Sequence, residues 1–402
     1  MSIIGIVCEF NPFHCGHKHL IDSVKKDGDT LVCVMSGNFV QRGEPAIFPK
    51  EIRVAAALKN GADIVLELPF IYATASAEFF CENAVRILES FGCDTLAFGS
   101  ECGDISTLKK ATEIIANPDF DEKFKQYLEN GVSYPTAREM AVRDFSDGTC
   151  ISLPNDILAV EYIKAINKNG YKIKPVTVKR EGAGYNSLDD NESFASATLL
   201  RKMIYEKDDI SRFIPENTRG IYMSAADDGR VIDKNKYELA ALSLLRSKID
   251  CIDESTAYMS EGLENRVKAA ISTETTLNGI FDAAKTKRYT HSRIRRAVLA
   301  SAFGITKDII SIKAPYLRLL GFNTNASEAL GKCVKNAKLP FIASYSDIAA
   351  LNDEIADCVF KKECEATDIF SLSLSKIEPC GAEMRYMPQK NKIICRNSCK
   401  IN

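Results

Sequence analysis

At the N-terminus, residues 2–17 read SIIGIVCEFNPFHCGH. The mostly apolar run at residues 2–10 predicts a short strand, and the apolar periodicity of residues 18–26 predicts a helix directly after it. His14 and His17 therefore lie in a tight turn that leads from a strand into a helix.

A turn of this kind predicts an anion site. The free N–H groups at the start of the helix and the positive end of its dipole both point to the turn. Gly16 has no Cβ, so a phosphate chain can approach the backbone closely. His14 and His17 add hydrogen-bond donors where negative charge develops during phosphoryl or nucleotidyl transfer. We therefore expect a nucleoside triphosphate to bind here.

Two simpler explanations of the histidine pair stay open at this point. Short motifs arise by chance, and the two imidazoles would then be surface residues beside a turn. The second alternative is that the pair binds a metal, but two histidines three residues apart without a third ligand make a poor zinc site. We predict no resident metal, and we favour the nucleotide site because the turn follows a predicted strand and opens a predicted helix.

The composition is that of an ordinary globular protein. The chain has 402 residues, enough for two domains, and a formal net charge of -2, which excludes a globally basic nucleic-acid-binding protein but not a local basic patch. No apolar stretch is long enough to span a membrane, and the N-terminus lacks the features of a signal peptide, so we predict a cytoplasmic protein. The 14 cysteines are scattered without the regular spacing of a disulfide framework, so we predict that they are reduced thiols.

Apolar runs alternate with helical patterns as far as about residue 205. Further strands are predicted at residues 30–36, 63–68, 95–98 and 172–178, and helices at residues 50–60, 75–90, 105–145 and 157–169. Because the alternation implies right-handed crossovers between parallel strands, the sequence predicts an α/β fold with a Rossmann-like doubly wound sheet. We assign residues 1–205 to this catalytic domain.

Polar residues follow several of these strands, and open α/β sheets bind ligands at that edge. Gly99 comes at the end of one strand, Arg180 ends another, and the loop at residues 37–45 carries Arg42. Asn155 is expected to bind a nucleotide or, like its neighbour Asp156, to cap the helix that follows. The alternatives are an ordinary turn glycine at Gly99 and a solvated cation at Arg180, and for Arg42 an exposed loop position is equally consistent.

A second anion site is predicted near residue 200. Ser196 and Thr198 lie at a predicted helix start, and Arg201 follows one turn later. Hydroxyls, N-terminal amides and a cation together suit a phosphate. A plain capped helix is the alternative.

Past residue 205 the pattern becomes mainly helical, and we assign residues 206–402 to an RNA-binding domain. Helices are predicted at residues 237–247, 265–272, 277–285 and 292–303, whereas the elements after residue 340 cannot be ordered. The densest basic cluster of the chain lies here, interleaved with Tyr289 and His291, which are expected to stack on bases. The cluster suits RNA phosphates, although a solvated helix face is the alternative. Its cations are Lys285, Lys287, Arg288, Arg293, Arg295 and Arg296.

These segments resemble a known family. The turn at residues 11–17 resembles the His-x-Gly-His motif of the nucleotidyltransferase superfamily, and residues 196–201 resemble its second motif, with Ala197 in place of a serine. The combination of several segments is similar to the tRNA(Met) cytidine acetate ligase family. These segments are EFNPFH from residue 9, MSGNFVQRGEP from residue 35, FGSE from residue 98, LPND from residue 153 and KRYT from residue 287.

The resemblance implies a reaction. ATP adenylates acetate and releases pyrophosphate, and the N4 amine of the wobble cytidine of elongator tRNA(Met) then takes the acetyl group, which gives N4-acetylcytidine. The resemblance implies catalytic roles for His14, His17 and Arg201, aided by Mg²⁺, while Ala197 costs the second motif one hydroxyl. We expect acetate near the Gln41–Arg42 loop. The implied ATP contacts are Val7, Cys8, Glu9, Phe10, Asn11, Pro12, Phe13, His14, Cys15, Gly16, His17, Lys18, His19, Leu20, Gly99, Asn155 and Arg180.

Two other functions compete with this interpretation. A nucleotidyltransferase acting on a small phosphorylated metabolite would share the turn, but it needs no large basic appendage. A non-catalytic RNA-binding protein would share the basic helix, but the intact His14, Gly16, His17 and Arg201 argue against it.

Overall fold

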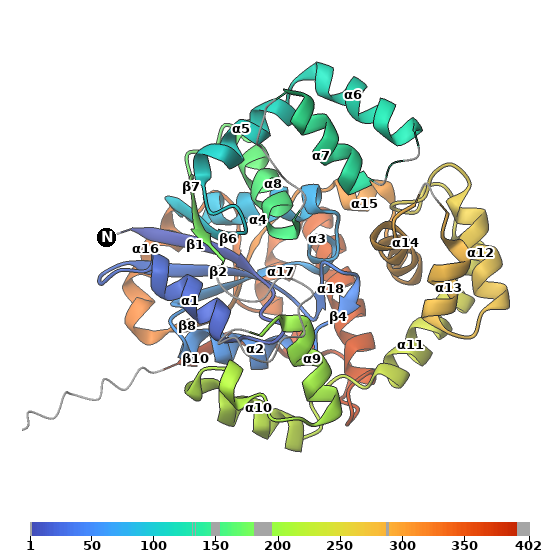
Figure 1. The fold of residues 1–402 in the computed structure, drawn as a ribbon. Helices are drawn as coiled ribbons and strands as arrows, with labels where there is room; N and C mark the ends of the chain where they lie inside the picture. Colours follow the sequence, from blue (N-terminus) through green and yellow to red (C-terminus); the bar gives the residue numbers. More distant parts are fainter. Residues whose placement is uncertain are drawn as a thin grey trace, which may run out of the picture.

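The fold is built on one mixed sheet. The computed structural model describes residues 2–130, 132, 134–145, 153–180, 195–286 and 289–391. The sheet has eight strands in the order β10-β8-β5-β2-β1-β6-β7, with β9 paired to β8 (Figure 1). The strands are β1 Ile3–Cys8, β2 Thr30–Ser36, β5 Ile64–Leu68, β6 Thr95–Ser100, β7 Lys174–Lys179, β8 Leu317–Asn323, β9 Phe341–Ile342 and β10 Gln389–Asn391, and β3 Phe39–Val40 and β4 Glu44–Pro45 form a separate hairpin.

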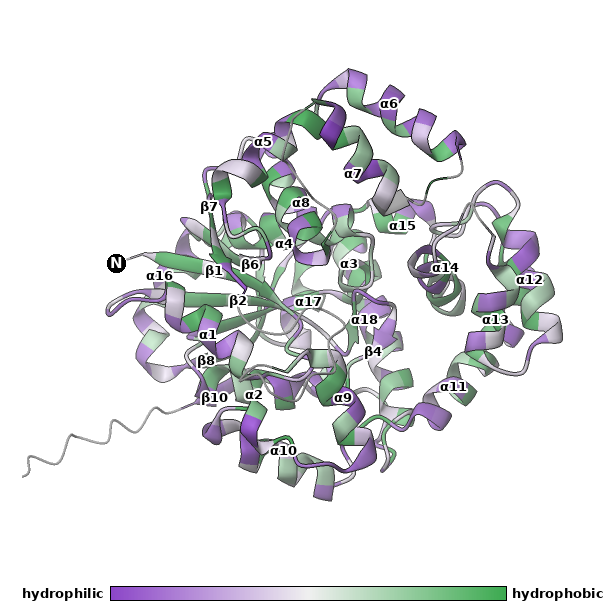
Figure 2. Cartoon of the chain, in the orientation of Figure 1, coloured by the Kyte–Doolittle hydropathy of each residue, from purple (hydrophilic) through white to green (hydrophobic). Residues whose placement is uncertain are grey.

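The first five strands of this sheet are parallel, which confirms the predicted Rossmann-like class. β2 and β5 are buried along their whole length, and Figure 2 shows the apolar character of the central strands, because helices cover both faces. From β1 the chain goes first to β2 and β5 on one side and later to β6 and β7 on the other. The carboxyl end of β1 is therefore at the switch point of the sheet, where such folds bind ligands.

Helices fill the connections. They are α1 Cys15–Val24, α2 Lys50–Lys59, α3 Phe70–Ala73, α4 Ala77–Phe91, α5 Ile105–Ile115, α6 Pro118–Glu129, α7 Tyr134–Phe145, α8 Pro154–Asn169, α9 Ala197–Glu206, α10 Glu216–Asp227, α11 Lys234–Ser247, α12 Leu263–Thr273, α13 Leu277–Ala284, α14 His291–Phe303, α15 Lys307–Ser311, α16 Ser327–Asn336, α17 Tyr345–Leu351, α18 Glu354–Leu372 and α19 Ala382–Arg385. In the described ranges, no helix combines the length and the apolar character that a membrane span needs.

One capping prediction is wrong. α8 begins at Pro154 and its N-cap is Leu153, so neither Asn155 nor Asp156 caps it. The physical reason is that proline suits the first helical position, so the helix begins at Pro154, three residues earlier than predicted. Asp156 instead accepts a hydrogen bond from the N–H of Cys102 at 3.0 Å.

The chain past residue 205 is mainly helical, and α11 to α14 form a group beside the sheet (Figure 1). The chain then returns to the sheet. β8 pairs antiparallel with β5, with Ile64 opposite Phe322, and β10 pairs in parallel with the other edge of β8. The sheet thus contains strands from both sides of the boundary predicted at residue 205.

A buried ionic network lies between these late elements and the early ones. Lys50 Nζ lies 2.5 Å from Glu67 and 2.6 Å from Glu383, and Arg318 lies 2.7 Å and 2.6 Å from the same two carboxylates. Glu363 lies 3.6 Å from Lys50, and its burial and the nearby Glu67 raise its pKa to about 8. At neutral pH the network therefore holds two cations against two carboxylates.

Candidate functional site

The rings of the two histidines lie against each other at the start of α1, with centroids 3.8 Å apart and planes tilted by 30°. His14 is the N-cap of the helix, and its Nδ1 accepts the N–H of Gly16 at 3.1 Å. His17 Nδ1 accepts the N–H of His14 at 3.3 Å. Since each Nδ1 is an acceptor, the proton of each neutral imidazole lies on Nε2, and each ring offers a donor there.

Both imidazoles are held neutral. Burial lowers the pKa of His14 to about 3, and the nearby Arg180 and Arg201 add to this effect. Burial also lowers the pKa of His17 well below its usual value, with further contributions from His14 and Arg180. The pair can therefore donate hydrogen bonds to an anion at neutral pH, but it brings no positive charge of its own.

Arg201 reaches the turn from α9. Its Nη1 donates to the carbonyl oxygen of Asn11 at 2.9 Å, and its Nη2 lies 3.7 Å from Glu44. Ser196 caps α9 by accepting the N–H of Leu199 at 3.1 Å, as the predicted helix start requires. The structure thus brings the two predicted anion sites together, although Asn11 and Arg201 are 190 residues apart.

The turn itself is anchored through its backbone. Asn11 Oδ1 accepts the N–H of Ile47 at 2.8 Å, and the Tyr222 hydroxyl of α10 accepts the N–H of Phe13 at 2.7 Å. The phenyl ring of Phe10 packs edge-on against His17, with centroids 5.0 Å apart. The other residues predicted to contact ATP lie at the end of β1, in the turn and in the first turns of α1. They are Val7, Cys8, Pro12, Cys15, Lys18, His19 and Leu20.

The ends of β6 and β7 lie beside this turn. A Cβ on Gly99 would lie 3.3 Å from Cγ of Arg180, so the glycine leaves room for that side chain. Asn155 Nδ2 donates to Glu101 at 2.6 Å, and Glu101 also accepts the N–H of Asp156 at 3.0 Å. Glu101 therefore orients Asn155, a role that the sequence did not predict.

Arg53 is a second residue that sequence reasoning missed. It is fully buried, and its Nη1 donates to the carbonyl oxygens of Glu9 at 2.7 Å and Ser36 at 3.1 Å. It thereby joins the ends of β1 and β2. The signal was available, because Arg53 stands among the small apolar residues of α2, where a cation needs buried partners.

The predicted RNA-binding helix is only partly as expected. Tyr289 is 4% exposed and its hydroxyl donates to the carbonyl of Glu261 at 3.0 Å, so the prediction that it stacks on bases is wrong. The ring is buried because it is largely apolar, and its hydroxyl finds partners in the segment that precedes α12. Lys287 and Arg288 lie outside the described residues, and Lys285 is exposed.

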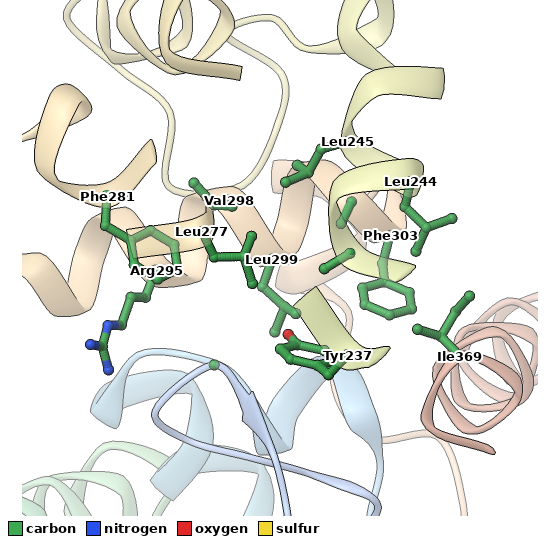
Figure 3. A pocket seen from close by; sticks show the side chains of 13 residues that line it. Tyr237, Leu244, Leu245, Leu277, Phe281, Arg295, Val298, Leu299, Phe303 and Ile369 are labelled. Atoms are coloured by element: carbon green, nitrogen blue, oxygen red, sulfur yellow. The ribbon is translucent and has the colours of Figure 1, made fainter. Parts of the chain in front are cut away.

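The three arginines of α14 are half-buried and differ in their contacts. Arg293 donates to the carbonyl of Tyr258 at 3.2 Å and to the hydroxyl of Ser260 at 2.5 Å. Arg295 extends beside the ring of Phe281 and away from the neighbouring apolar side chains (Figure 3). Those side chains surround a cavity of about 20 Å³, which has room for little more than one water molecule. Burial lowers the pKa of Arg296.

Among the described residues, one group of three acidic side chains has the spacing of a metal site: Glu67, Glu363 and Glu383. Lys50 and Arg318 already pair with it. We assign it to the ionic network rather than to catalysis.

Comparison with known proteins agrees with this geometry. The family model described as HIGH Nucleotidyl Transferase matches residues 1–383. A tRNA(Met) cytidine acetate ligase from Acetivibrio thermocellus is 38% identical over 392 residues, 92% of this chain and 94% of its own. One from Fervidobacterium nodosum is 39% identical over 360 residues, 86% of this chain and 84% of its own.

Solved structures agree as well. Thermotoga maritima TmcAL in its apo form superposes with a TM-score of 0.89 at 32% identity, covering 98% of this chain and 100% of its own. The form bound with alpha-thio ATP gives a TM-score of 0.88. Because the family model matches residues 1–383 and these relatives are more than 30% identical over most of the chain, the chain belongs to the tRNA(Met) cytidine acetate ligase family of HIGH nucleotidyl transferases.

Proposed function

We propose that the protein uses ATP to ligate acetate to the N4 amine of the wobble cytidine of elongator tRNA(Met), through acetyl-adenylate. The observation that carries this is the pair of neutral, adjacent histidines at the start of α1, together with Arg201, which donates to the carbonyl of Asn11 in the same turn. Because the substrate is a tRNA, we propose that the enzyme works in the cytoplasm.

In the first step an acetate oxygen attacks the α-phosphorus, and pyrophosphate leaves. The reaction needs no covalent enzyme group, since it depends on in-line placement and on stabilising the charge of the leaving group. His14 and His17 donate from Nε2 to the phosphates, while Arg201 and Arg180 supply the positive charge that the neutral histidines lack. Gly99 and Asn155 contact the nucleoside.

Mg²⁺ fits this site as an ion that the triphosphate carries. It prefers phosphate oxygens and water, and the acidic group of three in the described residues belongs to the ionic network instead. Bound there, it would neutralise charge on the departing pyrophosphate.

In the second step the tRNA lies against α14. An anticodon loop presents its bases unpaired, so the target cytidine reaches the adenylate at low energetic cost. Arg295 and Arg296 face the RNA phosphates, and the exposed Lys285 adds a further cation. The Gln41–Arg42 loop, between this helix and the turn, is where we place acetate.

Two measurements test the proposal. Mass spectrometry of tRNA(Met) incubated with ATP, acetate and enzyme should show one added acetyl group on the wobble cytidine. His17→Ala should lower acetate-dependent ATP–pyrophosphate exchange by about 100-fold or more, as the loss of one charge-stabilising donor does elsewhere. Exchange near the wild-type rate would refute the role of the histidine turn, and unmodified tRNA would refute the activity.

A further inference from the structure

Glu9 lies where the nucleotide turn meets the loop after β2. It directly follows Cys8, the last residue of β1, and it is half-buried. Its Oε1 accepts the N–H of Gln41 at 2.9 Å, and its backbone carbonyl accepts from Arg53. The carboxylate is therefore held against the loop after β2, and Arg53 holds the backbone of the same residue.

The surroundings of Glu9 favour proton acceptance. Burial raises the pKa of its carboxyl above the usual value, while Arg201 and Arg42 act in the opposite direction and Glu44 adds to the rise. A carboxylate with a raised pKa is a better base than one in water. The charged and titratable groups that face it are Cys8, Arg42, Glu44, Arg53, Tyr162 and Arg201.

The same loop touches the helix on which we place the tRNA. Gly43 lies against the backbone of Arg295, since a Cβ on it would be 3.6 Å from that residue's carbonyl carbon. Arg42 is close enough to both Arg201 and Arg295 for their charges to lower its pKa. The loop to which Glu9 is bonded thus lies between the phosphate end of the site and α14.

The acetyl transfer needs a proton acceptor. The lone pair of the cytidine N4 amine forms a bond to the acetyl carbon, the bond from that carbon to the phosphate oxygen breaks, and AMP leaves as an anion. One N–H proton must be lost. His14 and His17 cannot accept this proton on Nε2, because Nε2 already carries the ring proton. Their Nδ1 atoms are occupied as well, since each accepts a backbone hydrogen bond.

We propose that Glu9 is the catalytic base of the acetyl-transfer step and accepts that N4 proton. The proposal rests on the proposed function and adds a residue to its second half. Glu44 is the competing carboxylate, but it lies 3.7 Å from Arg201 and its side chain is 35% exposed.

The test separates the two steps with Glu9→Gln. Single-turnover transfer from synthetic acetyl-adenylate to tRNA(Met) should fall by about 100-fold, the usual contribution of a general base. Acetate-dependent ATP–pyrophosphate exchange should fall much less when ATP is saturating, because saturation compensates for any weakening of the ATP contact implied at Glu9. The acidic limb of the transfer pH profile should disappear in Glu9→Gln and return, shifted, in Glu9→Asp. Glu328→Gln, an exposed carboxylate on α16, is the matched control and should change neither step.

Three outcomes would overturn the proposal: equal loss of exchange and transfer in Glu9→Gln, transfer at the wild-type rate, or a transfer defect that appears in Glu44→Gln instead. Melting temperatures of Glu9→Gln and Glu9→Asp identify a folding defect, and Glu9→Asp then decides the question by its pH profile. If the wild-type enzyme gave no exchange, the proposed function would fail, yet transfer from synthetic acetyl-adenylate would still decide the role of Glu9.

Discussion

At the scale of single residues, the site depends on keeping protons off its two histidines. His14 is 7% exposed, and its pKa falls from 6.5 in the unfolded chain to about 3. Between pH 6.5 and pH 3 the unfolded state binds more protons at this residue than the folded state does. The free energy of unfolding is therefore highest above pH 6.5 and falls as the pH drops. We expect His14→Gln to remove about 1 kcal/mol per pH unit of this slope between pH 6 and 4.

Urea denaturation of the two proteins across that range measures the difference. Parallel curves for wild type and His14→Gln would mean that His14 is not held neutral by the fold.

The residues of the turn were predictable because their signal is local. His14, Gly16 and His17 lie within four positions of each other, and strand and helix patterns flank them. Arg53 and Glu101 were not predicted as site residues, because they act by bonding to Glu9 and Asn155, which only the folded chain brings near them. The burial of Tyr289 was hidden for the same reason, since its partner Glu261 lies on a separate segment.

At the scale of elements, the ionic network holds α2, β5, β8, α18 and α19 together. Arg318→Met would leave Glu67 and Glu383 with Lys50 as their single cation in a dry interior. Breaking a buried pair in this way costs about 3–5 kcal/mol of unfolding free energy. Urea denaturation should show that loss, while Lys332→Met, in an exposed pair with Glu328, should cost less than about 1 kcal/mol. Similar losses in both variants would contradict a structural role for the network.

The contacts of α14 divide its arginines into two kinds. Arg295→Gln and Arg296→Gln should each weaken tRNA binding and reduce the slope of log Kobs against log salt by about 1, while ATP–pyrophosphate exchange continues. Arg293→Gln should lower the melting temperature instead, because Arg293 bonds to Tyr258 and Ser260. Filter binding over a salt series and thermal melts check both outcomes. A triple variant with unchanged tRNA affinity would remove α14 from the RNA interface.

Many elements before residue 305 were predictable to within a few residues, since each has its own periodicity, but the helical region predicted at residues 105–145 consists of the three helices α5, α6 and α7. The helix predicted at residues 277–285 is α13, and the strand predicted at residues 30–36 is β2. β8 was missed because a short apolar run such as residues 317–323 fits a strand or a buried helix equally well. Its partner β5 lies some 250 residues earlier, and no local signal identifies such a pairing.

At the scale of the whole molecule, the sheet is shared by both halves of the chain. β5 is an inner strand between β2 and β8, so a fragment that ends at residue 215 would expose its edge and lose Arg318, Glu363 and Glu383 from the ionic network. Open, hydrophobic strand edges drive aggregation. We therefore expect residues 1–215 alone to be insoluble or to unfold without cooperativity, even though they contain the histidine turn and Arg201.

Co-expression makes this prediction specific. If the missing strand is the cause, residues 216–402 supplied as a second chain should restore solubility and ATP affinity, because β8 can then pair with β5 from outside. Residues 216–402 with Arg318→Met should restore less solubility and ATP affinity than the wild-type segment, since they supply β8 without the cation that pairs with Glu67. Calorimetric titration of ATP into each preparation measures the result. A soluble 1–215 fragment that melts cooperatively and binds ATP like the full chain would show that the nucleotide site is independent of the late strands, and the shared sheet would then have no part in forming it.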